Sequence, residues 1–354
     1  PQFLLDRYEN LVKFVLLVIP IFLRRYQKRY QISLSTIYHQ GQILDLEIKE
    51  LEIINEFLND DQITDILING HLQILIDKGK GLERTNKRFK TEDQLRRIVQ
   101  QIALRRGKRL DQSQPFVDLS LTKNIRFHCV LAPISSPGTL VSIRIHKTKT
   151  FALDQLQELK MFDYKTKIFL QKILKTKKSF VICGGTGSGK TTLLNSLISE
   201  IEQSKRILVI EDTKEILSNH PQLVSLEARP ANIEGFGQIT LRDLVKQSLR
   251  MRADRLIIGE VRGEEVVDWL AALNTGHKGG AGTLHANSIS EVITRFETLG
   301  LMAKVSQELI TKQLRNSLDY VIYLEKDENQ VRRIKDIGQF VFENDQLMIN
   351  RIEI

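Results

Sequence analysis

The chain has 354 residues, of which 42% are hydrophobic and 27% are charged, a balance typical of globular proteins that bury a full core. This composition excludes a disordered or collagen-like chain. The chain has only two cysteines, too few for a disulfide framework, which favours a reducing compartment. The formal net charge is +9, and residues 71–109 hold 12 Lys and Arg against 4 Asp and Glu. Such a basic stretch fits nucleic acid, anionic lipid or an acidic protein partner.

The N-terminal segment, residues 1–58, is predicted to be helical because apolar side chains recur there near helical spacing. Its most apolar stretch, residues 14–23, has about half of the ~20 residues that a membrane-spanning helix needs. Basic residues follow it and no small-residue cleavage site does, which argues against a signal peptide. We expect a helix that packs on a partner or on the rest of the chain, with contact to a membrane surface as the alternative.

Residues 59–148 are predicted to form a small α/β domain that begins with a β-hairpin. The apolar runs 66–68 and 72–76 flank Asn69-Gly70, a pair typical of two-residue β-turns.

A helix is predicted next, with Thr91 as its N-cap and Gly107 at its end. The apolar stripe of this helix consists of Leu95, Ile98, Val99, Ile102 and Ala103.

Two alternating strands follow, near 125–129 and 141–145. Because strand side chains alternate between the two faces, Arg126 and Arg144 are expected on the polar face of these strands. Residues 147–150 resemble a linker. From there the pattern changes to apolar runs that alternate with helices, which predicts a parallel α/β sheet in a domain over 149–354.

A phosphate-binding loop is the strongest motif of the chain. The buried-strand run 180–183 leads directly into Gly-Gly-Thr-Gly-Ser-Gly-Lys-Thr at 184–191, and an apolar helix follows. Backbone N–H groups of such a loop cradle phosphate oxygens, Lys190 is expected to reach the β- and γ-phosphates, and Thr191 to place its hydroxyl on Mg²⁺. The residues expected to bind nucleotide are Gly185, Thr186, Gly187, Ser188, Gly189, Lys190, Thr191 and Thr192.

Carboxylates follow two further predicted strands, which are expected beside the first. Glu211 ends the run 207–210, with Glu215 one helical turn later, and Glu260 follows the second run. Carboxylates at these strand ends point into the crevice where ligands bind. Gly259 stands where an Asp is usual, so direct metal ligation is lost there. Glu260 is expected to hold a magnesium-bound water or to orient the attacking one.

The stretch 274–287 is expected to be a glycine-rich loop that contains His277 and His285. A metal pair lacks a third ligand in this loop, so a neutral imidazole that senses the γ-phosphate is the better interpretation, above all for His285. Trp269, in a predicted helix, is expected in the core.

Together these residues resemble the Tad/CpaF-type ATPases of the type II/IV secretion and pilus-assembly family. The resemblance covers about residues 50–354. The matching segments are 184–191, Ile-Glu-Asp at 210–212, Ile-Gly-Glu-Val-Arg-Gly at 258–263 and the histidine-containing stretch 274–288.

The resemblance implies an α/β fold: a RecA-like P-loop NTPase domain with a smaller α/β N-terminal domain, assembled as a hexamer with nucleotide between the domains. It implies ATP and Mg²⁺ as ligands, a platform protein of the inner membrane as partner, and a cytoplasmic location peripheral to the membrane. Arg262 would help to close the site or hold Glu260 through an ion pair. The catalytic set that we expect is Glu211, Glu260, His285, Arg126 and Arg144, with Thr191 and Glu260 at the metal.

Two alternatives remain. A nucleic-acid motor would use the basic stretch 78–109, but Phe89 is its one aromatic residue, so a stacking platform is absent and nucleic acid is the weaker partner. A catalytically silent ATP-binding scaffold is opposed by the intact Lys190, Thr191, Glu211 and Glu260.

Overall fold

The computed structural model describes residues 52–354 except 80, 123, 146–149, 232–235 and 329. The predictions for residues 1–51, the apolar stretch 14–23 included, and most of the expected linker lie outside this part. What is described of the predicted helical segment is α3, Glu52–Leu58, which buries Ile54 and Leu58. No helix in the described part is long and apolar enough to cross a membrane.

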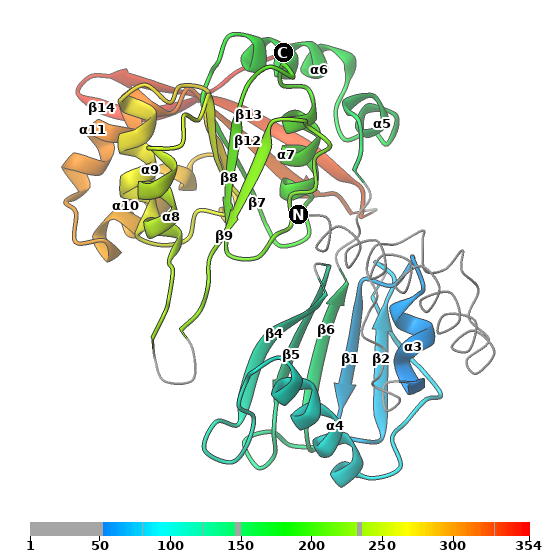
Figure 1. The fold of residues 1–354 in the computed structure, drawn as a ribbon. Helices are drawn as coiled ribbons and strands as arrows, with labels where there is room; N and C mark the ends of the chain where they lie inside the picture. Colours follow the sequence, from blue (N-terminus) through cyan, green and yellow to red (C-terminus); the bar gives the residue numbers. More distant parts are fainter. Residues whose placement is uncertain (1–51, 80, 123, 146–149, 232–235, 329) are drawn as a thin grey trace, which may run out of the picture. The chain divides into compact units, whose positions relative to one another are not determined.

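The first sheet has six antiparallel strands in the order β3-β2-β1-β6-β5-β4 (Figure 1). Its strands are β1 Asp65–Asn69, β2 Gln73–Asp77, β3 Leu82–Arg84, β4 Phe116–Thr122, β5 Ile125–Val130 and β6 Leu140–Ile145. Every second residue of β1, β2, β4, β5 and β6 is buried, as expected for a sheet with one face on a core.

The predicted two-residue turn at Asn69-Gly70 is wrong. Asn69 pairs with Gln73 inside the sheet, and the turn spans the three residues 70–72. The observed register places Ile68 opposite Ile74, and both are buried. A two-residue turn would have set the buried face of one strand against polar residues of the other, so burial overrides the local turn preference.

The predicted helix over 91–107 is confirmed as α4, Glu92–Arg105. The Thr91 side chain accepts a hydrogen bond from the Gln94 N–H, and all five predicted stripe residues are buried. Glu92 in the first turn accepts hydrogen bonds from the backbone N–H groups of His71 and Thr139. The helix is thereby tied to the β1–β2 turn and to the segment before β6.

The second sheet has eight strands in the order β14-β13-β12-β7-β11-β10-β8-β9. The six strands from β12 to β9 are parallel, and β13 and β14 continue the sheet antiparallel. The strands are β7 Phe180–Gly184, β8 Ile207–Glu211, β9 Leu223–Glu227, β10 Arg255–Ile258, β11 Ala281–Leu284, β12 Tyr320–Lys326, β13 Arg332–Glu343 and β14 Gln346–Arg351.

Helices cover both faces of this sheet (Figure 1). Val181 and Cys183 of β7 belong to one hydrophobic core, and Phe180 and Ile182 to the other, because strand neighbours point to opposite faces. The helices of one face are α5 Leu153–Glu158, α6 Tyr164–Lys175 and α7 Lys190–Ser199; those of the other are α8 Leu241–Ser248, α9 Glu265–Asn274, α10 Glu291–Met302 and α11 Gln307–Ser317.

The expectation that 274–287 is one loop is wrong in its second half. Residues 281–284 form β11, a fully buried strand between β7 and β10. The strands at 207–211 and 255–258 therefore do not lie directly beside β7. The Trp269 ring packs closely against this strand, since a Cβ on Gly282 would lie 3.2 Å from the ring. A small residue therefore fits well at this position. Trp269 itself is fully buried, as predicted.

Candidate functional site

The phosphate loop runs from the end of β7 to the start of α7. Its first glycine, Gly184, has φ +151°, and a Cβ there would lie 2.3 Å from the backbone oxygen of Leu324 in the neighbouring β12. A residue with a side chain would therefore force the loop away from the sheet. Gly187 and Gly189 also have positive φ, and the exposed Gly185 and Thr186 complete the turn.

Lys190 begins α7 and is 7% exposed. Its Nζ donates to the backbone oxygens of Gly184 and Gly185, at 2.8 Å each. Burial lowers the pKa of Lys190, and the carboxylates of Glu260 and Glu215 act against this shift. In the described part of the chain no carboxylate forms an ion pair with this amine. The buried Ser188 hydroxyl also has no hydrogen-bond partner there. This cradle fits an anionic ligand such as phosphate.

Thr191 and Thr192 follow in the first turn of α7, both half-buried. They lie where the motif places the metal-binding hydroxyl and its neighbour. No group of three His, Cys, Asp or Glu side chains that could hold a metal occurs among the described residues.

Glu211 lies at the end of β8 and is 3% exposed. Its Oε1 accepts hydrogen bonds from the N–H groups of Glu215 and Ile216, at 2.9 Å each, and Ser225 Oγ lies 3.4 Å from Oε2. Burial raises the pKa of Glu211 to about 7, although the two backbone bonds act against the shift. A Cβ on Gly259 would lie 2.8 Å from Glu211 Cγ. The Glu211 side chain thus occupies the space that a side chain at 259 would need.

Glu260 and His285 follow the neighbouring parallel strands β10 and β11 and meet at the same edge of the sheet. His285 Nε2 lies 3.4 Å from Glu260 Oε1. Burial, with Lys190 nearby, lowers the pKa of His285, while Glu260 acts against the shift. A cavity of about 580 Å³ opens here; its lining includes Gly184, Gly185, His285, Asn287 and Arg295. The predicted Glu260 and His285 are therefore brought together beside the phosphate loop.

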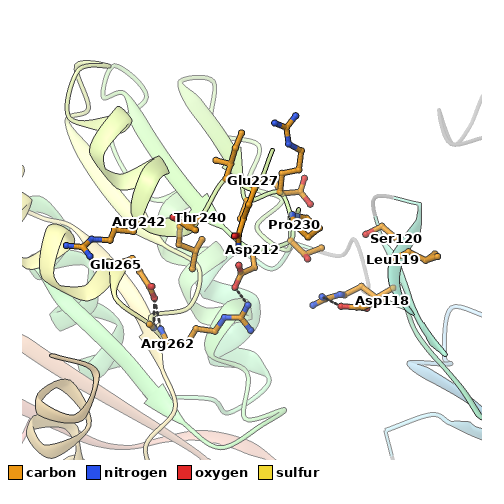
Figure 2. A pocket seen from close by; sticks show the side chains of 18 of the residues that line it. Asp118, Leu119, Ser120, Asp212, Glu227, Pro230, Thr240, Arg242, Arg262 and Glu265 are labelled. Carbon is orange, nitrogen blue, oxygen red and sulfur yellow. Dashed lines mark hydrogen bonds and ion pairs between the residues drawn. The ribbon is translucent and has the colours of Figure 1, made fainter. Parts of the chain in front are cut away.

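Arg262 pairs with Asp212, not with Glu260 as one interpretation had it (Figure 2). Its backbone N–H and that of Gly263 each donate to Glu265 Oε1 at 2.8 Å. These bonds fix the segment between β10 and α9, which follows Glu260 in the sequence.

Arg126 and Arg144 are direct cross-strand partners on β5 and β6. Each pairs with a carboxylate at 3.1 Å: Arg126 with Asp118 and Arg144 with Asp65. Like charges that face each other across a ladder repel by a few tenths of a kcal/mol to about 1 kcal/mol. The two arginines lie together on the polar face, as the strand alternation predicts, and the two aspartates balance their charges.

Two residues near the phosphate loop, Glu215 and Arg332, are not among the site residues predicted from the sequence. Glu215 acts on the pKa of Lys190, whereas Glu211 is not among the causes of that shift. Arg332, at the start of β13, donates from Nε to the Gly187 oxygen at 2.8 Å. The acidic pair Glu211 and Glu215 was visible in the sequence, but the hydrogen bonds that join Glu211 to the turn after β8 were not. No local signal marks Arg332, since its contact joins segments 145 residues apart.

The chain matches known proteins over most of its length. A family model described as "Type II/IV secretion system protein" matches residues 47–336. "Putative conjugal transfer protein Rv3659c" of Mycobacterium tuberculosis is 40% identical over 84% of this chain and 86% of its own length. "Conjugal transfer protein TrbB" of Rhizobium radiobacter is 28% identical over 79% of this chain and 84% of its own length.

Solved structures show the same fold. The Legionella pneumophila ATPase DotB superposes with a TM-score of 0.57 and 21% identity, over 82% of this chain and 80% of DotB. The pilus retraction motor PilT, solved with bound ADP, gives a TM-score of 0.55 and 22% identity, over 78% of this chain and 77% of PilT. With the phosphate loop and the family match together, the chain belongs to the type II/IV secretion system protein family and is an ATPase with the α/β fold of that family.

Proposed function

We propose that this protein is a hexameric motor that hydrolyses MgATP and uses the energy to assemble a Tad/type IV-like pilus or to drive related protein secretion. The observation that carries the proposal is the loop 184–191 with its buried Lys190, which lacks a carboxylate ion-pair partner in the described part of the chain, beside the Glu260–His285 pair. A site that merely binds ATP has no need of an acidic group and an imidazole at the γ-phosphate end of the loop.

The reaction is an in-line attack of water on the γ-phosphate. Glu260 orients the attacking water, and His285 holds Glu260 through the Nε2 contact and links loss of the γ-phosphate to the segment after β11. The lowered pKa of His285 favours a neutral imidazole, which donates from one nitrogen only. To reach the phosphates, Lys190 Nζ breaks a hydrogen bond with a backbone oxygen of the loop. Nucleotide binding thus replaces a carbonyl acceptor by a phosphate oxygen.

Glu211 and Glu215 are the two candidates for a second acidic group at the site, in addition to Glu260. Glu211 was predicted for it, but its Oε1 is engaged by the turn that follows β8. Glu215, carried by this turn, acts on Lys190. We propose that Glu211 builds the turn and that Glu215 supplies the negative charge at the loop.

Mg²⁺ would be held by the Thr191 hydroxyl and, through water, by Glu260, and it would neutralise charge between the β- and γ-phosphates. Hydroxyl and carboxylate oxygens are the ligands that this cation prefers. The half-buried position of Thr191 at the start of α7 fits such a role.

Arg126 and Arg144 would neutralise charge on the γ-phosphate during transfer, each exchanging its Asp partner for phosphate oxygens. The domain over 59–148 would move relative to that over 149–354 through the linker near 147–150, and this motion would be the mechanical step.

The hexamer, the Tad/CpaF type, the platform partner and the position at the inner face of the membrane are proposals supported by the four matching motifs. The relatives named for conjugal transfer favour keeping one competitor, a motor that acts on nucleic acid. DNA binding that persists at physiological salt would support this competitor.

The test is phosphate release by the purified chain, with the mass in solution recorded for each variant. We expect slow Mg²⁺-dependent hydrolysis that Glu260→Gln, Glu215→Gln and Arg144→Ala reduce at least tenfold while nucleotide binding and the hexamer persist. The matched control is Glu308→Gln, an exposed carboxylate on α11, which should hydrolyse as the wild type does. Unchanged hydrolysis by Glu260→Gln would refute the assigned carboxylate. ATP binding without any hydrolysis, even with the membrane partner, would establish a silent scaffold instead.

A further inference from the structure

The hairpin of β12 and β13 places an arginine on the outside of the phosphate loop. β12 runs parallel to β7, with Leu324 opposite Gly184, so the hairpin continues past the point where the loop begins. Arg332 lies opposite Lys326, the pair next to the turn between β12 and β13. Its Nε donates to the Gly187 oxygen at 2.8 Å, and its Cδ lies 3.1 Å from where a Cβ of Gly189 would stand.

The hairpin is firmly anchored. Asp327 accepts a hydrogen bond from the Val331 N–H at 2.8 Å and pairs with Arg333 at 3.0 Å, which closes the turn between the strands. The Ile334 N–H donates to the Met161 oxygen at 2.8 Å, which joins β13 to the segment between α5 and α6. Arg332 therefore extends from a fixed framework onto a loop built of glycines.

The bond restrains one particular peptide group. In a trans peptide the C=O and the following N–H point in opposite directions, so a donor on the outer Gly187 oxygen directs the Ser188 N–H inward. This N–H does point into the loop, 3.4 Å from the Gly185 oxygen. Gly187 has φ +72° and Gly189 +98°, and glycines leave a backbone free to rotate unless something holds it.

We infer that Arg332 is a positioning residue for the nucleotide site: it holds the Gly187–Ser188 peptide so that the Ser188 N–H faces the phosphates of a nucleoside di- or triphosphate. A hydrogen bond to the carbonyl also polarises the peptide and strengthens its N–H as a donor. The inference rests on the proposed nucleotide site. Since the loop contacts phosphates before and during transfer alike, Arg332 contributes to binding and not to the chemical step.

The experiment compares Arg332→Met, which keeps the aliphatic stem, with Lys190→Ala as the loss-of-binding reference and with Arg351→Met as matched control. Arg351 is an exposed arginine of β14 that pairs with Asp336 and takes no part in the turn between β12 and β13. A fluorescent ADP analogue is titrated into each full-length variant, KM and kcat for ATP are measured, and melting temperatures are recorded. We expect the Kd and KM of Arg332→Met to rise about tenfold with kcat within twofold of the wild type, and Arg351→Met to bind normally. Arg332→Lys, which keeps a donor of different shape, should lie between the two.

A Kd for Arg332→Met within twofold of the wild type would overturn the inference, even with a lowered melting temperature, because that pattern marks a purely structural arginine. If Arg332→Met does not fold, Arg332→Lys decides alone: a rise of about threefold in Kd supports the inference, and an unchanged Kd overturns it. If the wild type and Lys190→Ala bind the analogue equally, the nucleotide site itself is wrong and the role of Arg332 falls with it.

Discussion

Glu211→Gln tests the carboxyl that the fold buries most deeply beside the phosphate loop. The folded protein holds the Glu211 proton up to about pH 7, whereas a model carboxyl releases it near 4.5. Between these values the unfolded chain binds fewer protons than the folded one, so the free energy of unfolding falls as pH rises, by about 1.4 kcal/mol per pH unit. From pH 5 to pH 8 the loss amounts to about 2.5 kcal/mol.

Gln at this position cannot ionise and escapes that loss. Its Oε1 can still accept from the Glu215 and Ile216 N–H groups, and its amide can donate to Ser225, so the local geometry is kept. The melting temperature of Glu211→Gln minus that of the wild type should therefore increase between pH 5 and pH 8, by about 5–10 °C for an ATPase lobe of this size.

The assay is thermal unfolding in matched buffers at pH 5, 6, 7 and 8. Glu227→Gln is the matched control: Glu227 ends the neighbouring strand β9 at the same register as Glu211 but is exposed, so its difference from the wild type should stay flat. A Glu211→Gln difference that is equally flat across this range would refute the reasoning that burial, and not the hydrogen bonds, dominates at this carboxyl.

Three further predictions concern the packing around the site and the smaller sheet. Gly259→Ala should cost about 1–3 kcal/mol through contact with Glu211, and thermal unfolding of the double variant with Glu211→Ala should show strong non-additivity; simple additivity would exclude the contact as the cause. Glu92→Ala should leave two backbone N–H groups without acceptors, cost about 2–3 kcal/mol in urea unfolding and speed hydrogen exchange at Thr139; unchanged exchange would contradict this. Gly279→Ala should destabilise the protein in urea unfolding by at least 2 kcal/mol more than Gly276→Ala does. Both glycines have positive φ, but only a Cβ at 279 would meet the Arg255 guanidinium. Equal losses would show that backbone strain is the whole effect.

The elements that the sequence predicts well are those whose signals are local. Thr91, the apolar stripe and Gly107 define α4 within one window of the chain, and the phosphate loop carries its strand, glycines and lysine in a single segment. The turn at 70–72 and strand β11 were predicted wrongly, because each is decided by partners far away. Ile74 and Ile76 set the register of the turn, and Trp269 packs closely against Gly282 of β11, where a Cβ would lie 3.2 Å from its ring.

The candidate site divides in the same way. Lys190, Glu260 and His285 are recognisable because they stand in motifs, and alternation alone places Arg126 and Arg144 on one face. The engagement of Glu211 by its own turn could not be predicted, since it depends on how the chain bends after β8. Arg332 could not be predicted either, because its role exists only through a hairpin that follows the last recognisable motif.

The position of β7 in its sheet has a consequence for how the protein is made. Phe180 pairs with Ala281 on one side and with Tyr320 on the other, about 100 and 140 positions later in the chain. At a synthesis rate of about 5–20 residues per second, the strand that carries the phosphate loop waits on the order of 10–30 s for its second neighbour. Until β11 is made, both edges of the apolar run Phe180 to Cys183 are unpaired, and one edge stays unpaired until β12 follows. Unpaired edges of this kind recruit chaperones or aggregate. We expect the nucleotide site to become protease-resistant on the ribosome only after β12 has emerged.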